Sequence, residues 1–314
     1  SVILPQEWLT FIEWDHSMFC APLRIAYHLF DKITLSLPPT KLIFPDHSNR
    51  WSWVHASCNG LLLVYDGQGK KFVLNPITKE IREVPRPPFR LDPSKSVNVK
   101  WALGYDAVSD DYKVVTMSYY GFDFDDNGNM IEPDSTEMLV NVYSLKSGSW
   151  KKAESSPDYQ SVASKGGPAV FVDGCIHWFS RRTIDQKDTI VAFDLAEEKF
   201  REVPLPNSID SCKLAVLGGC LCTFDETRPD VWVMKEHGVQ KSWTKFTINH
   251  PEPPDLMWPL CWLGEEAMVM RYNNSLLIHN LKRRNFMDIK FPSIAGYIHS
   301  EVSFVESLVS PYGW

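Results

Sequence analysis

The sequence predicts an all-β fold, a six-bladed β-propeller whose last blade is closed by strands from both ends of the chain. Aromatic residues make up 13% of the 314 residues, with 12 Trp, and the 22 Pro outnumber the 16 Gly. This composition is typical of many short strands joined by tight turns. A motif also recurs along the chain, with Gly-containing turns upstream of it. Periods of about 40–50 residues with four short strands each indicate propeller blades.

The recurring motif is a strand end, a polar turn and a large apolar residue at the ninth of twelve positions. Four copies align without gaps at 73–84, 142–153, 192–203 and 278–289, with Ile81, Trp150, Phe200 and Phe286 at the ninth position. A longer copy at 231–246 reaches Trp243, and a weaker one at 24–38 reaches Ile33. Successive anchors are 48, 69, 50, 43 and 43 residues apart. We expect each to be the structural anchor of one blade, buried between neighbouring sheets.

Two-residue turns precede these windows at Asn59-Gly60, Asp173-Gly174 and Gly218-Gly219, pairs that tolerate positive φ and predict β-hairpins. Each blade then has strand a, a tight turn, strand b, a variable loop, strand c, a polar turn and strand d. We expect one domain, 1–314, with blades near 51–86, 99–154, 166–205, 213–249 and 259–292, and a sixth made of 300–309 with 8–37. The strands within that N-terminal part are expected near 8–14, 23–30 and 32–37. Sharing the closing blade removes free sheet edges.

The order of the strands predicts which loops share a face of the ring. Strand b starts at the face that carries the a–b turns, and the N-terminal strand is strand b of the closing blade. The b–c and d–a loops therefore lie on the opposite face, away from any segment fused before Ser1.

Composition excludes several classes of partner. A net charge of −7 at pH 7 argues against nucleic acid, because binding phosphates needs a basic surface. No uncharged run reaches the length of about 18 residues that a membrane span needs. The seven scattered Cys have no zinc-ligand spacing and predict a reducing compartment, the cytoplasm with the nucleus as an alternative. Because Ser1 begins without Met and without a signal-peptide pattern, we expect a piece of a longer protein.

The largest insertion, 121–137, is acidic and holds no basic residue. Its carboxylates are Asp123, Asp125, Asp126, Glu132, Asp134 and Glu137. The run 123–128 matches the start of a calcium loop, with Asp134 at the twelfth position, but the usual Glu is missing there and the flanks have a strand pattern. Calcium binding is therefore the weaker interpretation. The favoured ones are a solvated b–c loop or a docking loop that attracts a basic target protein.

No motif for a nucleophile, a zinc protease or a phosphate-binding loop occurs, so we predict no catalytic residue, no metal and no cofactor. Cys175 and His177 share one face of a strand. A reactive thiol–imidazole pair is the alternative there to simple packing within a blade.

Aromatic residues gather in the predicted b–c and d–a loops or at their edges, with two arginines nearby. Aromatic and Arg side chains dominate the energetics of protein interfaces, so they predict a surface that binds a target protein. With the acidic loop, the candidates are Trp51, Trp53, Phe89, Tyr119, Tyr120, Phe122, Asp123, Phe124, Asp125, Asp126, Tyr159, Arg181, Arg182, Trp258 and Tyr297. Packing of half of the aromatic residues between blades is the alternative.

Several segments resemble the F-box-associated domain of plant F-box/kelch-type proteins, a superfamily that includes S-locus F-box-like proteins. They include Cys58-Asn59-Gly60, GYDAVSDDYKVV (104–115) and VWVMKEHGVQKSW (231–243), in matching order over roughly 57–311. The resemblance implies a kelch-like propeller that recruits a substrate protein. It also implies an N-terminal F-box that binds the Skp-type adaptor of a cullin-based SCF ubiquitin ligase.

The chain departs from this family in lacking the F-box itself: Leu4-Pro5 opens like one, but the continuation does not follow. Contact with the Skp-type adaptor and cullin is therefore expected only through an upstream segment. We predict a substrate-recognition module of a ubiquitin ligase. The alternatives are S-locus-type recognition of basic ribonucleases in self-incompatibility, action on immune receptors, a non-ligase scaffold or decoy, and an enzyme with its site in the propeller channel.

Overall fold

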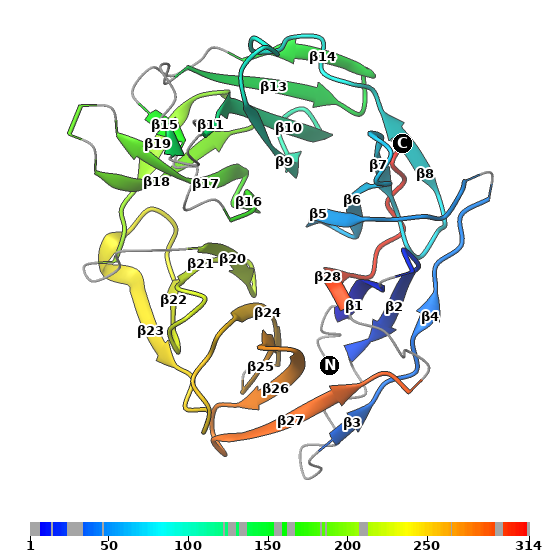
Figure 1. The fold of residues 1–314 in the computed structure, drawn as a ribbon, viewed down its shortest axis with the longest axis vertical. Helices are drawn as coiled ribbons and strands as arrows, with labels where there is room; N and C mark the ends of the chain where they lie inside the picture. Colours follow the sequence, from blue (N-terminus) through cyan, green and yellow to red (C-terminus); the bar gives the residue numbers. More distant parts are fainter. Residues whose placement is uncertain are drawn as a thin grey trace.

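The computed structural model describes residues 7–13, 15–23, 34–45, 47–121, 123–124, 130–131, 137–153, 159–161, 167–182, 184–185, 187–206, 213–264, 266–292 and 298–312. Six small sheets surround a central channel, which confirms the predicted six-bladed propeller (Figure 1). The innermost strands of the blades, in ring order, are β5 (Trp53–Cys58), β9 (Val97–Asp106), β16 (Val170–Val172), β20 (Lys213–Leu217), β24 (Met257–Leu263) and β28 (Ile298–Val305).

Antiparallel strands b, c and d follow outward in each blade. In the first three blades they are β6 (Leu61–Tyr65), β7 (Lys71–Leu74) and β8 (Ile81–Val84); β10 (Asp111–Tyr120), β13 (Met138–Ser144) and β14 (Ser149–Lys152); and β17 (Cys175–Arg182), β18 (Asp188–Asp194) and β19 (Phe200–Val203). In the fourth and fifth they are β21 (Cys220–Phe224), β22 (Asp230–Met234) and β23 (Trp243–Thr247), preceded by a 3₁₀ turn (Gln240–Ser242), then β25 (Ala267–Tyr272), β26 (Ser275–Asn280) and β27 (Asn285–Lys290). Two short additions are β15 (Tyr159–Ser161), which pairs with β17, and the hairpin β11 (Asp123–Phe124) with β12 (Met130–Ile131).

The closing blade joins both ends of the described chain. Strand β28 pairs with β1 (Glu7–Glu13), with Trp8 opposite Phe304, and β1 pairs with β2 (Met18–Pro22). Closure by N- and C-terminal strands in one blade is therefore confirmed. A tail after β28 adds a second attachment, because the Asn75 side chain donates to the Ser307 and Val309 carbonyls at 2.9 and 2.8 Å.

The outer part of this blade differs from the prediction. Its fourth strand is β4 (Thr40–Lys41), which pairs with β2, whereas β3 (Thr34–Ser36) runs parallel to β27 at the edge of the fifth blade. The physical reason is burial, since Leu35 and Leu37 pack in the hydrophobic cluster of the fifth blade. Most of the strand expected near 23–30, and the anchor Ile33, lie outside the described residues.

Inner strands are apolar on both sides because each sheet lies between two others. Strand β6 is buried at four consecutive residues, 61–64, as expected for a strand covered on both faces. Asn59 and Gly60 have φ of 48° and 88°, and Asp173 and Gly174 have 50° and 74°, which the predicted hairpin turns require. Among the described residues, no helix is long and apolar enough to cross a membrane.

The sequence-predicted anchors lie at the start of the outer strands. The indole nitrogens of Trp150 and Trp243 donate to the carbonyls of Pro85 and Pro204, which follow the outer strand of the preceding blade, at 2.9 and 2.8 Å. Phe286 stacks on His279, with ring centroids 4.4 Å apart. Of the described anchors, Trp243 is buried, whereas Ile81, Trp150, Phe200 and Phe286 are half-buried. Burial was expected for Trp150, Phe200, Trp243 and Phe286; Trp150, Phe200 and Phe286 pack against hydrophobic clusters but stay partly exposed, because the outer strands lie at the rim, next to solvent.

Candidate functional site

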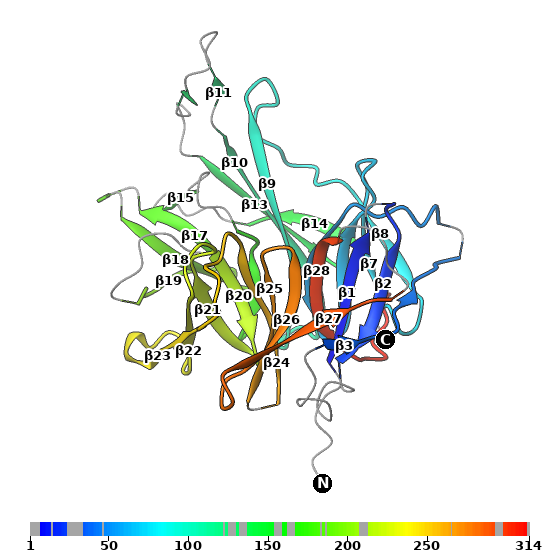
Figure 2. The same cartoon turned by 60° about the horizontal axis from the view of Figure 1, so that its bottom comes forward.

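Two faces of the ring differ in what they carry. Figure 2 shows β11, in the β10–β13 connection, at one end of the molecule and the start of β1 towards the other. We name the face of the b–c and d–a loops the loop face, and the face of the a–b and c–d turns the turn face. Strand β1 begins on the turn face, so the loop face lies away from the first described strand.

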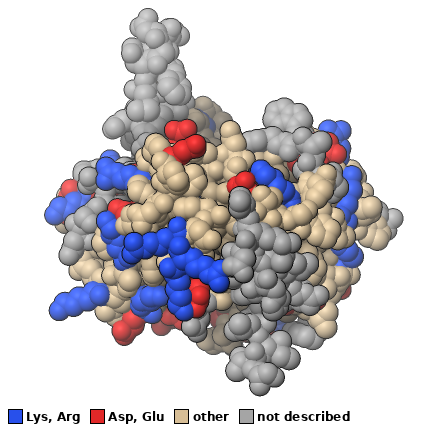
Figure 3. Space-filling view, turned by 90° about the horizontal axis from the view of Figure 1, so that it is seen from below, with Lys and Arg blue, Asp and Glu red and all other residues tan. Residues whose placement is uncertain are grey.

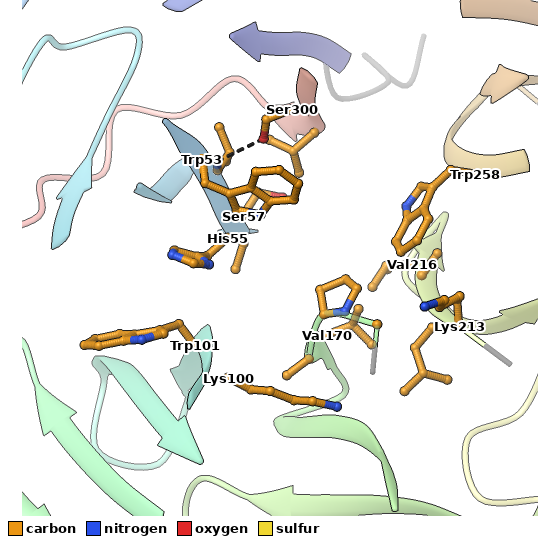
Figure 4. Close-up of a pocket in the computed structure, with 18 of the residues that line it drawn as sticks. Trp53, His55, Ser57, Lys100, Trp101, Val170, Lys213, Val216, Trp258 and Ser300 are labelled. Carbon is orange, nitrogen blue, oxygen red and sulfur yellow. Dashed lines mark hydrogen bonds between the residues drawn. The ribbon is translucent and has the colours of Figure 1, made fainter. Parts of the chain in front are cut away.

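A cavity of about 670 Å³ occupies the mouth of the channel. Its lining comes largely from the first residues of the innermost strands, which start at the loop face. Figure 4 shows Trp53 and His55 from β5, Lys100 and Trp101 from β9, and Lys213 and Trp258 from β20 and β24. Six strands far apart in sequence thus supply one site.

Aromatic side chains form much of this wall. Trp53 is 49% exposed, which is unusual for an indole without a partner surface. Trp258 is half-buried and meets Phe224 edge-on, with ring centroids 5.0 Å apart. Tyr119 is buried and lies below Lys100, whose ammonium is 5.9 Å from the centre of the ring. The cavity therefore offers apolar contact together with positive charge.

Lys100 is the most unusual group in the cavity. Its ammonium nitrogen is buried and has no hydrogen-bond acceptor among the described residues, although the residue as a whole is partly exposed. Burial, and then the positive charge of Lys213, lowers the pKa of Lys100 to about 8. Burying a charged group without a partner is costly, so such groups are rare in folded proteins.

Lys213 approaches the cavity from the other side of β16. Its side chain is 22% exposed, and its ammonium lies 3.8 Å from Glu226, at the outer limit of an ion pair. A Cβ on Gly167 would lie 3.2 Å from the Lys213 Cδ, so the absence of a side chain at 167 leaves room for the lysine stem.

On the opposite wall the charged groups are paired with each other. Both Glu301 carboxylate oxygens accept from Arg271 Nη1, at 3.0 and 2.9 Å. Burial raises the pKa of Glu301 despite this pairing. Ser300 Oγ accepts the Val54 backbone N–H at 3.0 Å and joins the closing blade to the first. Burial, and then Lys71, lowers the pKa of His55 to about 4, which leaves its ring neutral at pH 7.

Of the predicted binding residues, the structure brings Tyr119 and Trp258 to this cavity, together with Trp53. Phe89 is 43% exposed, and the Tyr120 hydroxyl accepts the Asp92 backbone N–H at 3.2 Å. These residues lie at loops or strand ends of the loop face.

Three other predicted residues are engaged within the chain. Arg181 donates to Asp188, and Arg182 to Asp185, both at 2.8 Å. Trp51 is fully buried and stacks on His47, with ring centroids 4.4 Å apart. Trp51 is therefore a core residue and not part of a binding surface, because its indole packs under the connection between β4 and β5.

The acidic insertion is described only in part. Asp123 and Phe124 lie in β11, inside the insertion, and Tyr159 lies in β15. The strand pattern predicted for the flanks of the insertion is confirmed by β10 and β13. Phe122, Asp125, Asp126, Glu132, Asp134 and Tyr297 fall outside the described residues. In the part of the chain that the structure does describe, no group of three or more His, Cys, Asp or Glu could hold a metal ion.

Cys175 and His177 do not form a reactive pair. Both are buried, and burial raises the pKa of the Cys175 thiol to about 11, which keeps it protonated. His177 Nε2 lies 2.8 Å from His237 Nε2. Burial, and then the His237 ring, lowers the pKa of His177 to about 3.

Lys100 and Lys213 were not among the predicted site residues. In sequence, Lys100 is one polar residue at the start of a strand pattern, and such residues are usually solvated. A signal was nevertheless present, since Lys100 precedes Trp101 at the start of an innermost strand, where side chains face the channel or a neighbouring blade.

A separate group of basic residues lies on the face shown in Figure 3. In Figure 3, Lys and Arg gather at the lower left of one flank, where β23 and the β26–β27 turn lie. Lys282, Arg283 and Arg284 of that turn are exposed, and Lys282 pairs with Glu266. These basic side chains are exposed to solvent, unlike the buried ammonium of Lys100, and they do not line the cavity.

An open cavity with aromatic residues in its wall thus lies at the loop face of a six-bladed β-propeller. The model of the F-box associated beta propeller domain matches residues 13–264, and the chain belongs to this family. It is 34% identical over 251 residues to the F-box protein CPR1 of Arabidopsis thaliana, covering 72% of this chain and 60% of that protein. An F-box/kelch-repeat protein of the same plant is 26% identical over 267 residues, covering 82% of this chain and 69% of that protein.

Solved structures match the fold alone. A chain of the nidogen/laminin complex has a TM-score of 0.53 at 10% identity, covering 96% of this chain and 99% of that chain. TolB from Acinetobacter baumannii has a TM-score of 0.52 at 8% identity, covering 95% of this chain and 66% of that chain. At such identities the likeness says nothing about ligands.

Proposed function

We propose that this chain is the substrate-recognition module of an SCF-type ubiquitin ligase and binds the target protein at its loop face. The observation that carries the proposal is the F-box associated propeller domain together with an open, aromatic channel mouth. Exposed aromatic groups around a cavity are the usual anchors of a protein interface. The module itself performs no chemistry; transfer of ubiquitin belongs to the partner enzymes of the ligase.

The direction of the chain supports this role. An upstream F-box would join the module at the turn face, where β1 begins. The Skp-type adaptor and cullin would then lie on that side, and the target on the other. A bound target would face away from the adaptor and towards the enzyme that carries ubiquitin.

The proposal is tested by affinity capture from plant extract with the proteasome inhibited. The double variant Trp53→Ser with Trp258→Ala removes two aromatic groups of the cavity, and Val108→Ser is the matched control. Val108 is 85% exposed in the β9–β10 turn, on the turn face. We expect the captured target to be lost with the double variant and kept with the control. Equal capture by both would contradict a target site at the loop face.

The acidic insertion is proposed to favour a basic target. S-locus-type recognition of a basic ribonuclease is the second candidate function on this ground, because the sequence of the insertion holds six Asp and Glu and no Lys or Arg, and an acidic segment of this kind attracts a cationic protein. Neutralising Asp123, Asp125 and Asp126 to Asn should slow association with the captured target at low salt. An unchanged rate and salt dependence would leave only a solvated insertion, and no shift in melting at millimolar calcium would exclude the calcium interpretation.

A further inference from the structure

The charged groups in the channel mouth have the opposite sign to the whole chain. The described residues of the lining include Lys100, Lys213 and Arg271 and one carboxylate, that of Glu301, while the chain carries −7. Glu301 is paired with Arg271. In the part of the chain that the structure describes, Lys213 has the distant ion pair with Glu226 at 3.8 Å, and Lys100 has no acceptor. A concave, partly apolar wall weakens solvent screening, so two like charges there attract an anion strongly.

Lys100 indicates where in the cavity an anion would bind. Its buried ammonium has three donors and no acceptor in the described part of the chain. The neighbouring Tyr119 ring, at 5.9 Å, is a weak substitute for an acceptor. A bound carboxylate or other oxygen anion would accept hydrogen bonds from the Lys100 ammonium. It would also neutralise the buried charge and so offset the free-energy cost of its burial.

The size and chemistry of the cavity indicate which kind of molecule carries the anionic group. A volume of about 670 Å³ accommodates a few side chains of one segment and not a folded domain. Trp53 and Val99, 49% and 43% exposed, offer apolar contact beside the two ammonium groups. A peptide segment with an acidic group next to apolar side chains matches both the apolar surface and the two ammonium groups.

We propose that the channel mouth binds an acidic peptide segment of the target protein, with one carboxylate held between Lys100 and Lys213. This inference rests on the proposed function and names the feature of the target that the module recognises. The carboxylate belongs either to an Asp or Glu side chain or to the end of a chain. The acidic insertion at the rim would act on a different part of the same target.

Peptide pools test the inference directly. The propeller is incubated with an array of mixed ten-residue peptides in which one central position is fixed as Glu, Asp, Gln, Asn, Lys or Leu. Each pool is made with an amidated and with a free C-terminus. We expect the Glu and Asp pools to bind at least about tenfold more strongly than the Gln and Asn pools, as for loss of a charge-assisted hydrogen bond. A preference confined to free C-termini would identify a chain end as the source.

Two cavity variants and a matched control complete the design. Lys100→Met and Lys213→Met keep an unbranched side chain that is one atom shorter and remove the charge. Lys187→Met removes an exposed lysine of the β17–β18 loop. We expect the acid preference to disappear in both cavity variants and to persist in the control. Melting curves of all three variants verify folding. Equal binding of acidic and amide pools, or no binding of any pool, overturns the inference, as does an acid preference that survives in both cavity variants.

The outcome is separable from that of the proposed function. If target capture from extract is lost with the Trp53→Ser, Trp258→Ala variant but unchanged with Lys100→Met and Lys213→Met, the module binds its target and the carboxylate inference alone is wrong. If the aromatic variant also leaves capture unchanged, the proposed site of target binding is wrong as well.

Discussion

Two regions of the propeller differ in whether their polar groups find hydrogen-bond partners. One region is the contact between the outer strands of neighbouring blades, called the seam here, and the other is the mouth of the channel. At the seams, Trp150 and Trp243 donate to proline carbonyls of the preceding blade at 2.9 and 2.8 Å. At the mouth, the buried ammonium of Lys100 has no acceptor in the described residues. A group that the chain itself satisfies serves the fold, whereas an unsatisfied one marks a place where stability is lower than it could be. Such places are commonly kept for a ligand.

The largest expected effect comes from breaking the ring itself. Deleting Ser300–Trp314 removes most of β28 and the tail that attaches to Asn75. We expect loss of soluble folded protein, because β1 and the neighbouring innermost strands lose their partner and free an edge. Yield and circular dichroism measure this. A shorter deletion of 307–314 keeps β28 and should lower the melting temperature without abolishing folding. Equal stability of the longer deletion and the parent would contradict this closure.

Among point changes, Trp243→Ala at the seam of the third and fourth blades is expected to cost most. Emptying a large buried aromatic site costs about 3–5 kcal/mol, and the bond to Pro204 is lost as well. Trp150→Ala should cost less, because Trp150 is half-buried. Urea unfolding gives both values. Unchanged stability of both variants would mean that the outer seams do not hold the blades together.

Acid should destabilise the protein through buried histidines. Burial lowers the pKa of His177 to about 3 and that of His279 to about 4, below the ordinary value of 6.5. Between pH 6.5 and 4 the unfolded chain therefore binds more protons than the folded one, and stability falls as pH falls. His177 alone accounts for a loss on the order of 3 kcal/mol by pH 4. His177→Gln should flatten this slope, and Val108→Ser should not; parallel slopes would refute the assignment.

The smallest effect on stability is expected from Lys100→Met, and this variant tests the difference between the seams and the channel mouth most directly. Removing a buried charge without a partner should leave the melting temperature at pH 7 unchanged or higher, unlike any change at the seams. In the parent, stability should rise with pH between about 8 and 10.5, because the folded state releases the Lys100 proton first. This rise should be smaller in Lys100→Met, where the part that remains comes from Lys71, whose pKa burial also lowers to about 8. A clear loss of stability in the variant would show that Lys100 holds the fold together.

Sequence patterns predicted the blades because their causes are local. Turn pairs such as Asn59-Gly60 fix a hairpin, and the apolar run of residues 61–64 indicates a strand covered on both faces. Prediction failed where a residue's surroundings come from elsewhere in the chain. Trp51 was expected at the surface and is buried on His47, and β3 joins β27, which is remote in sequence.

By itself, the sequence determined the all-β class, the number of blades, closure by both ends and the face on which the variable loops lie. These follow from strand periodicity, turn residues and strand order, which are properties of neighbouring residues. Only the tertiary structure decided which polar groups find partners. Arg271 and Glu301 meet across two blades and neutralise each other, while Lys100 and Lys213 reach one cavity from two other blades. Electrostatic pairing depends on distance in space and on burial, and neither can be read from position in the chain.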